Sequence, residues 1–330
     1  MTLERACGRL RRARTIGIVR TDHLGDMVLT LPLVRALREE FSTARIVIVA
    51  HSRTAPLIEG SGVADVCMYT DRMLFGDILR TSRFDALFFA YPRPEHAWLA
   101  WRAGVPLRVG TAYRWWSVFY NVRIRDHRSQ ALFHEAEYNV RMLEYIVGKR
   151  FRIELVPPPV LPDAREEIEQ FLAVHEVSSS DPLVVLHPGG RGSAPRWDKF
   201  PQLALLLEHQ LPNYRIVVTG SDADVLQCAA ITAAVPSALN TCGRFSLDRT
   251  IALLARADVV VANSTGILHI ATALGRAVVG LYPSEPPALS PARWGPLGSR
   301  CTVFAAMPIT SIAVEDVATA ACHMARESLL

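Results

Sequence analysis

Residues 257–286 read as a strand, a tight polar turn, a helix and a second strand in immediate succession. Apolar residues at 259–262 predict a buried strand, and the turn Asn263-Ser264-Thr265-Gly266 leads into a helix expected at 267–274, before a second strand at 278–282. Because a helix that joins two buried strands is a parallel crossover, this stretch restricts the chain to an α/β fold. The free N–H groups and positive dipole end of the helix form a candidate anion site, with His269 about one turn inside.

The same alternation of short apolar runs and longer amphipathic segments fills both halves of the chain. In the first half we expect strands at 16–19, 45–50, 66–70, 86–91 and 107–111, the last of them short, and helices at 26–41 and 131–147. In the second half we expect further strands at 183–187 and 215–220, and helices at 200–210, 224–234 and 247–257. This spacing predicts an α/β chain of two doubly wound, Rossmann-like parallel sheets that face a cleft, with ligands at the carboxyl ends of the strands.

A proline-rich stretch separates the two halves. Four prolines within residues 155–162 cannot continue a strand ladder or a helix, so we expect a linker there. The predicted organisation is an N-terminal domain at 1–155, a linker at 156–163 and a C-terminal domain at 164–330, whose last helix could pack back on the first domain. A length of 330 residues suits two domains.

The sequence lacks the signatures of several common classes of protein. No apolar run is long enough to span a bilayer and the basic N-terminus lacks a signal-peptide core, so we expect a cytoplasmic protein. Six scattered cysteines without a Cys-x-x-Cys pair predict reduced thiols rather than zinc ligands or disulfides, and we expect no metal site. Dinucleotide, Walker A and Gly-x-Ser-x-Gly motifs are also missing.

Charge is divided unevenly between the halves. Residues 1–150 contain 22 arginines and one lysine against 15 acidic residues, whereas the remainder has a formal charge of −4. This asymmetry indicates an anionic partner for the first half, although a general preference for arginine would give the same count. No zinc-finger, RNP or KH signature supports nucleic acid. We expect the four tryptophans at 98, 101, 115 and 116 to pack in the core or at its rim; the alternative is that they contact a membrane surface.

The loop after the first predicted strand, Arg20 to Asp26, carries the candidate acid/base groups. Gly25 allows a sharp turn into the helix. Asp26 is either an ordinary N-terminal helix acid or a general base for a hydroxyl group, and Asp22 and His23 are alternative proton acceptors in the same loop.

The loop at 187–197 follows the first strand of the second half. Its three glycines and two arginines suit a diphosphate, because bare N–H groups can approach it while an arginine neutralises its charge; a flexible connection is the alternative. Trp197 and Phe200 are expected to pack in the core. Asp224 could grip ribose hydroxyls or cap a helix.

Four ordered blocks between about 15 and 286 make the chain resemble glycosyltransferase family 9, the ADP-heptose-dependent heptosyltransferases of lipopolysaccharide inner-core synthesis. The blocks are IGIVRTDHLGDMVLTLPLVRALREEF, RVGTAYRWWSVFYNVRI with the following His134–Asn139, HPGGRGSAPRWDKFPQLALLL, and RFSLDRTIALLARADVVVANSTGILHIATALGRAVVGLYPSEP. The resemblance implies a GT-B fold and an inverting transfer of heptose from ADP-heptose to an acidic glycan of the lipopolysaccharide core. We expect this transfer to be metal-independent, because the helix dipole and an arginine can take the place of a metal ion at the diphosphate. The resemblance implies no cofactor beyond the donor itself.

The resemblance also implies roles for individual residues. Asp26 matches the general base, and Asp224 and Phe245 match the ribose and adenine contacts. The remaining donor residues match the diphosphate loop and the phosphate-binding helix: Gly190, Arg191, Ser193, Arg196, Ser264, Thr265, Gly266 and His269. The acceptor set is expected to comprise Arg20, His23, Gly25, Arg114 and Arg123.

Two departures from the family pattern leave alternatives open. Ser264 stands where the family usually has an aspartate that contacts the donor sugar, and Pro195-Arg196 stands where a lysine often precedes the tryptophan, so Arg196, Arg191 or Lys199 would neutralise the phosphates. The alternatives are a sugar-nucleotide epimerase of the same fold, a binding protein without catalysis, or a family 9 transferase with another donor or acceptor. Peripheral contact with the cytoplasmic face of the inner membrane is a further expectation.

Overall fold

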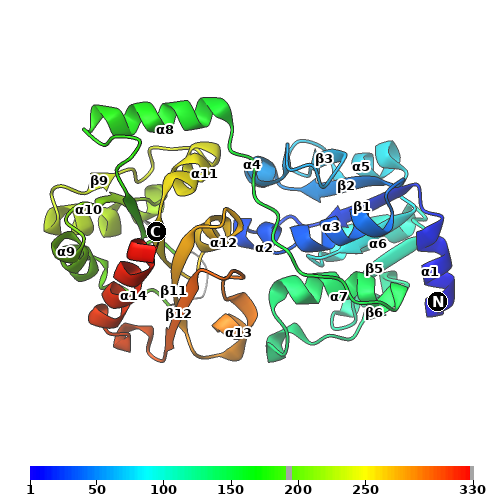
Figure 1. Cartoon of the computed structure of the whole chain (residues 1–330). Helices are drawn as coiled ribbons and strands as arrows, with labels where there is room; N and C mark the ends of the chain where they lie inside the picture. Colours follow the sequence, from blue (N-terminus) through cyan, green and yellow to red (C-terminus); the bar gives the residue numbers. More distant parts are fainter. Residues whose placement is uncertain (191–194, 328–330) are drawn as a thin grey trace. The chain divides into compact units, whose positions relative to one another are not determined.

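The computed structural model describes residues 1–190 and 195–327 and separates into two compact units, Met1–Val156 and Pro157–Leu330 (Figure 1). Each unit contains one six-stranded, entirely parallel sheet with helices packed on it. The prediction of two doubly wound parallel sheets is therefore confirmed. Among the described residues, no helix is long and apolar enough to cross a membrane.

The sheet of unit 1 has the strand order β3-β2-β1-β4-β5-β6. Its strands are β1 Thr15–Val19, β2 Arg45–Ala50, β3 Val66–Tyr69, β4 Ala86–Phe89, β5 Leu107–Thr111 and β6 Val122–Ile124. Its helices are α1 Leu3–Arg11, α2 Leu24–Val28, α3 Leu31–Glu40, α4 Ala55–Ile58, α5 Phe75–Ser82, α6 Pro94–Arg102 and α7 Glu135–Val147, with 3₁₀ turns η1 Ser52–Thr54, η2 Trp115–Phe119 and η3 Arg128–Gln130. Valine and phenylalanine side chains of β1, β2 and β4 form one core layer with α5 and α6.

Three details of unit 1 differ from the sequence-based expectations. The strand at 107–111 is not the last, because β6 follows it and pairs with β5. The helix expected at 26–41 is two helices, since Pro32 has no N–H to bond the carbonyl of Val28 and α3 starts afresh at Leu31. The helix expected from 131 begins at Glu135, where His134 Nδ1 accepts from the N–H of Ala136 at 3.2 Å.

Unit 2 repeats the topology with the strand order β12-β11-β10-β7-β8-β9. Its strands are β7 Leu183–His187, β8 Arg215–Val218, β9 Leu239–Asn240, β10 Val259–Asn263, β11 Ala277–Pro283 and β12 Cys301–Ala306. Its helices are α8 Pro162–Val174, α9 Phe200–Gln210, α10 Val225–Ala234, α11 Leu247–Arg256, α12 Gly266–Ala273, α13 Pro291–Trp294 and α14 Val314–Glu327, with 3₁₀ turns η4 Asp222–Asp224, η5 Pro287–Leu289 and η6 Ile309–Ser311. The last two residues of the expected linker at 156–163 belong to α8, which starts at Pro162.

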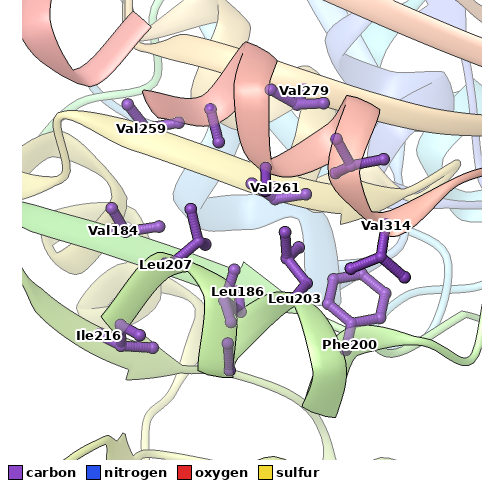
Figure 2. Close-up of a cluster of buried hydrophobic side chains, with 14 of the residues drawn as sticks. Val184, Leu186, Phe200, Leu203, Leu207, Ile216, Val259, Val261, Val279 and Val314 are labelled. Atoms are coloured by element: carbon purple, nitrogen blue, oxygen red, sulfur yellow. The ribbon is translucent and has the colours of Figure 1, made fainter. Parts of the chain in front are cut away.

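The core of unit 2 lies between its sheet and two helices (Figure 2). Apolar side chains of β7, β8, β10 and β11 meet those of α9, and Val314 of α14 joins them. Trp197 and Phe200 are each 1% exposed, which confirms that they pack in the core. All six cysteines are free thiols, as expected.

Both sheets reverse their winding direction at one point. In unit 1 this point lies between β1 and β4, and in unit 2 between β7 and β10. Ligands of doubly wound sheets bind beyond the carboxyl ends of the strands at such switch points. The loops that follow these four strands are therefore the places to look for function.

Candidate functional site

A buried arginine occupies the switch point of unit 1. Arg20 directly follows β1 and is 3% exposed, and its Nη1 donates to the carbonyl of Ala90, just after β4, at 3.1 Å. Two acidic side chains of the same loop bind its guanidinium. Asp22 accepts from Nε at 2.7 Å and from Nη2 at 3.0 Å, and Asp26 accepts from Nη2. Arg20 thus connects the loop between β1 and α2 to the ends of both central strands, β1 and β4.

A third carboxylate reaches Arg20 from α7. Glu135 is 1% exposed and accepts from Arg20 Nη1 at 3.3 Å, while Arg128 also donates to it. Burial alone would lower the pKa of Arg20, but the carboxylates of Asp26, Asp22 and Glu135 raise it overall. Two arginines and three carboxylates therefore form one charged cluster, in which Arg20 and Glu135 are buried.

The backbone at Asp26 is fixed by the break between α2 and α3. Thr30 Oγ1 donates to the carbonyl of Asp26 at 2.7 Å. Asn139 of α7 is fully buried, and its Nδ2 donates to the carbonyl of Leu29 at 3.0 Å and to Thr30 Oγ1 at 3.2 Å. Its Oδ1 accepts from Arg128 Nη2 at 3.1 Å. Helix α7 thus holds Asp26 by its main chain and, through Glu135 and Arg20, by its carboxylate.

The environment of Asp26 adjusts its acidity. Burial of its carboxyl group raises the pKa, Arg20 opposes this, and the negative charges of Asp22 and Glu135 add to it, so the pKa rises to about 6. The side chain is still 15% exposed, so part of it reaches solvent. A carboxylate with a pKa near neutrality that reaches solvent is suited to accept a proton.

The other acceptor residues expected in unit 1 take varied positions. Gly25 is buried beside Asp26, and His23 is exposed at the N-cap of α2. Arg123 donates to the carbonyls of Tyr120 at 3.2 Å and Val118 at 3.3 Å, and Arg114 lies over the Trp116 ring, so both contact η2. Sequence reasoning assigned no role to Arg128, Glu135 or Asn139, although Glu135 and Asn139 lie in the block His134–Asn139 that contributes to the family resemblance.

A buried asparagine marks the switch point of unit 2. Asn263 is the last residue of β10 and is 2% exposed. Its Nδ2 donates to the carbonyl of Pro188, just after β7, at 2.9 Å, and its Oδ1 accepts from the N–H of Trp197 at 3.0 Å. Asn263 therefore binds the residues at both ends of the segment 187–197 to the end of β10. Arg191 and Ser193 of that loop lie outside the described residues.

The start of this loop approaches a buried carboxylate. A Cβ at Gly189 would lie 2.7 Å from Asp224 Oδ2, so only glycine fits there. Asp224 is 3% exposed, and its Oδ2 accepts from the N–H and Oγ of Ser221 at 3.0 and 2.7 Å. Burial acts against ionisation, but these hydrogen bonds and Arg196 lower the pKa of Asp224.

Asp224 takes the capping role considered from the sequence, and its contact with a ribose stays a prediction. Oδ2 belongs to the capping box of η4. Oδ1 is buried and has no hydrogen-bond partner among the described residues; the nearest cation, Arg196 Nη1, is 3.8 Å away. Arg196 also donates to the carbonyl of Gly190. One oxygen thus remains for a ligand hydroxyl, next to an arginine.

The N-terminus of α12 follows β10 directly. Thr265 is its N-cap, makes no side-chain capping bond, and its Oγ1 is buried without a hydrogen-bond partner in the described part of the chain. Ser264 donates its N–H to the carbonyl of Leu281 at 3.0 Å, so it belongs to the strand end. The first N–H groups of α12, from Gly266 on, are available to an anion. His269 lies inside this helix and is 4% exposed.

Two further observations concern Phe245, which is expected to contact the nucleoside base, and the residues that could bind a metal ion. Phe245 packs edge-to-face on Phe171, with ring centroids 5.2 Å apart, and Arg244 lies over both rings. The chain contains one Asp-x-Asp sequence, Asp222-Ala223-Asp224, whose second carboxylate is engaged by Ser221. Within residues 1–190 and 195–327, no three His, Cys, Asp or Glu side chains group as metal ligands.

Comparisons with known proteins agree on one family. The model of glycosyltransferase family 9 (heptosyltransferase) matches residues 72–318. Lipopolysaccharide heptosyltransferase 2 of Escherichia coli K12 is 27% identical over 288 residues, which cover 80% of this chain and 81% of that protein.

Solved structures show the same fold. A family 9 glycosyl transferase from Veillonella parvula has a TM-score of 0.83 at 19% identity, covering 95% of this chain and 97% of that one. The E. coli ADP-heptose lipopolysaccharide heptosyltransferase II has a TM-score of 0.80 at 22% identity, covering 96% and 100%. The expected GT-B type of fold is thereby confirmed.

Proposed function

Because this chain belongs to glycosyltransferase family 9, the heptosyltransferases, we propose that it transfers heptose from ADP-heptose to an acidic glycan of the lipopolysaccharide core. The names of its E. coli relatives, which act on lipopolysaccharide and ADP-heptose, support this choice of acceptor and donor. The basic first half of the chain suits an acceptor that carries negative charge. In this proposal unit 1 binds the acceptor and unit 2 binds the donor.

The observation that carries the proposal is the buried, partly accessible carboxylate of Asp26, with its pKa raised to about 6. Asp26 takes the proton of an acceptor hydroxyl while that oxygen attacks the anomeric carbon. The bond from this carbon to the diphosphate breaks, and ADP leaves with the electron pair. One displacement at the anomeric carbon inverts its configuration. Arg20 and Glu135 position the base. The guanidinium of Arg20, expected to contact the acceptor, is instead buried and bound by carboxylates, so the proposed acceptor residues are His23, Gly25, Arg114 and Arg123.

The donor half of the proposal rests on the switch point of unit 2. The N–H groups of α12 and of the loop at 187–197, which contains Gly190, would stabilise the charge that develops on the departing diphosphate, together with Arg196. Asp224 Oδ1 would accept from a ribose hydroxyl, and Phe245 would flank the base. Arg191, Ser193, Thr265 and His269 complete the proposed donor set, and no metal ion is required.

Ser264 favours a second candidate, a family 9 transferase with another donor sugar. A serine cannot supply the negative charge of the aspartate that the family usually places there, so contacts with the sugar differ. Stabilisation of the native state by ADP-, UDP-, GDP- and CMP-sugars, read as a shift in Tm, ranks the donors. A larger shift with a hexose nucleotide than with ADP-heptose would favour the second candidate.

We also propose a cytoplasmic location with peripheral contact with the inner membrane. The acceptor named for the relatives, lipopolysaccharide, carries a lipid, so an enzyme acting on it works at a membrane surface. The absence of a spanning helix in the described residues leaves surface contact as the mode to test.

The direct test of the base is Asp26→Asn. We expect the rate of transfer to fall by roughly 10²–10⁴, the usual contribution of a general base, while ADP binding measured by calorimetry stays within about twofold. Asp77→Asn is the matched control, because Asp77 lies on the surface of unit 1 and pairs only with Arg80 among the described contacts. Transfer by Asp26→Asn within a few-fold of the unchanged protein would refute the assignment.

A further inference from the structure

Residues 96–125 have an unusual composition for a segment of a folded domain. They contain five arginines, no aspartate or glutamate, and four of the six tryptophans of the chain. The structure places this segment on α6, β5, η2 and β6 of unit 1. None of the steps proposed for transfer uses its tryptophans.

Helix α6 presents aromatic side chains outward. Its inner face is fixed in the core by Ala97, Ala100 and His96, whose ring stacks on Phe75 at 4.2 Å. Trp98 is 37% exposed and Trp101, one turn later, is 51% exposed. The guanidinium of the exposed Arg102 lies 5.3 Å from the centre of the Trp98 ring. The outer face of α6 is therefore apolar and positively charged together.

The neighbouring turn η2 extends this face. Ser117 is buried and anchors the turn, because its Oγ donates to the carbonyl of Thr111 at 2.6 Å. Trp115 and Val118 point outward with 74% and 62% of their surface exposed. The ring of Trp101 contacts that of Phe119 at 5.5 Å, so α6 and η2 form one continuous surface.

We propose that this surface, the α6–η2 patch of Trp98, Trp101, Arg102, Arg114, Trp115 and Val118, docks unit 1 on an anionic phospholipid bilayer. Indole rings favour the boundary between headgroups and acyl chains, because they combine a large apolar surface with a polar N–H. Arginines beside them bind lipid phosphates, and basic charge adds to the affinity for anionic lipid. The acidic residue of α6, Glu95, pairs with Arg93 at 3.3 Å.

The charge of the patch favours a bilayer over a second copy of the chain. In a symmetric dimer the patch would face itself, so Arg102 and Arg114 of both copies would be brought together without an acidic partner on the patch. A bilayer rich in phosphate groups complements both the arginines and the exposed rings. The proposal deepens the membrane contact put forward above, but its test needs neither donor nor acceptor.

The test is sedimentation of the full chain with vesicles of phosphatidylcholine, with or without phosphatidylglycerol. We expect binding to the anionic vesicles that weakens with added salt, and much weaker binding to neutral ones. Trp101→Ala with Trp115→Ala should lower the partition coefficient at least tenfold, and Arg102→Gln roughly fivefold. Tyr145→Ala on α7 and Arg152→Gln are matched controls, since both residues are exposed outside the patch.

Three results would overturn the proposal. The first is equal partition of the unchanged protein and the double tryptophan variant. The second is a change of oligomeric state in that variant, which would assign the patch to a second copy. The third is that the double tryptophan variant no longer transfers sugar to a water-soluble acceptor, which would assign the patch to binding of the glycan. Since Asp26→Asn should bind vesicles normally, failure of the membrane proposal and failure of the transfer proposal are distinguishable.

Discussion

The carboxylate of Asp26 lies among opposing charges, and this balance decides the pH range in which it can act. Burial and the neighbouring Asp22 and Glu135 favour its protonated form, whereas Arg20 favours the ionised one. Asp26 can serve as a base only when it is ionised. The pKa of about 6 places that condition just below neutral pH.

The first prediction concerns the pH dependence of transfer. We expect kcat/KM to rise tenfold per pH unit below about pH 6 and to level off above it, because the fraction of ionised Asp26 follows this curve. Initial rates across the range measure it, and calorimetric ADP binding at each pH is the control. A profile that stays flat well below pH 5 would contradict the role of Asp26.

The second prediction concerns stability. The folded pKa of Asp26 is about 6 and lies above its ordinary value of 3.8, so the unfolded chain loses this proton first. The free energy of unfolding therefore falls as the pH rises from about 4 to about 6 and stays lower above that range. Asp26→Asn should therefore be more stable than the unchanged protein by ~1–3 kcal/mol at pH 7.5, with the difference shrinking toward pH 4. Urea unfolding at the two pH values measures this, and a variant that is less stable at pH 7.5 would contradict it.

Single residues could be identified from the sequence only where local patterns reveal them. Asp26 follows a strand and a Gly-containing turn, and this position marks it as a candidate. Glu135 and Asn139 lie more than 100 residues from Arg20 and Leu29, with which they interact. No local pattern distinguishes a buried acid of α7 from the exposed acids usual at a helix start.

Elements are joined to their loops by a few buried polar side chains. Asn263 connects the end of β10 to Pro188 and Trp197 in the loop after β7. If Asn263 becomes Ala, a buried N–H and a buried carbonyl lose their partners, at a cost of ~1–3 kcal/mol each. We expect Asn263→Ala to lose ~2–4 kcal/mol of stability in urea and to bind ADP more weakly.

Asn213→Ala is the control for that variant, because Asn213 is exposed between α9 and β8. It should change stability by less than ~0.5 kcal/mol. If Asn263→Ala were as stable as Asn213→Ala, the loop at 187–197 would not depend on the strand end.

The N-terminus of α12 leads to a prediction about metals. Its N–H groups and Arg196 would supply the positive charge that a divalent cation provides in other transferases. We expect excess EDTA to leave the transfer rate within about twofold, with Mg²⁺ returned to a parallel sample as the control. A loss of more than tenfold that Mg²⁺ restores would show that the diphosphate needs a metal ion.

Elements with long apolar runs were predictable, and those set by tertiary contacts were not. The strands at 45–50 and 183–187 match, since buried parallel strands are nearly all apolar. Strand β6 has only three residues with Arg123 at its centre, and the break at Leu29–Thr30 is stabilised by Asn139 from another helix. Neither carries a periodic signal of its own.

At the scale of the whole molecule, the chain repeats one topology in two units. Each sheet reverses between its first and fourth strand, and at each reversal a buried polar side chain, Arg20 or Asn263, binds a carbonyl of the opposite loop. The repeated alternation of strands and helices predicted this architecture, whereas the proposed donor and acceptor rest on membership of the family. The proposed transfer takes its base and acceptor contacts from unit 1 and its donor contacts from unit 2.

Release of ADP from ADP-heptose, measured with and without a heptose-deficient lipopolysaccharide core, decides whether this transfer takes place. We expect ADP to be released only when the core is present, with one heptose of inverted anomeric configuration attached for each ADP. Turnover of the donor without acceptor, or tight binding of ADP-heptose without turnover on any core acceptor, would contradict it.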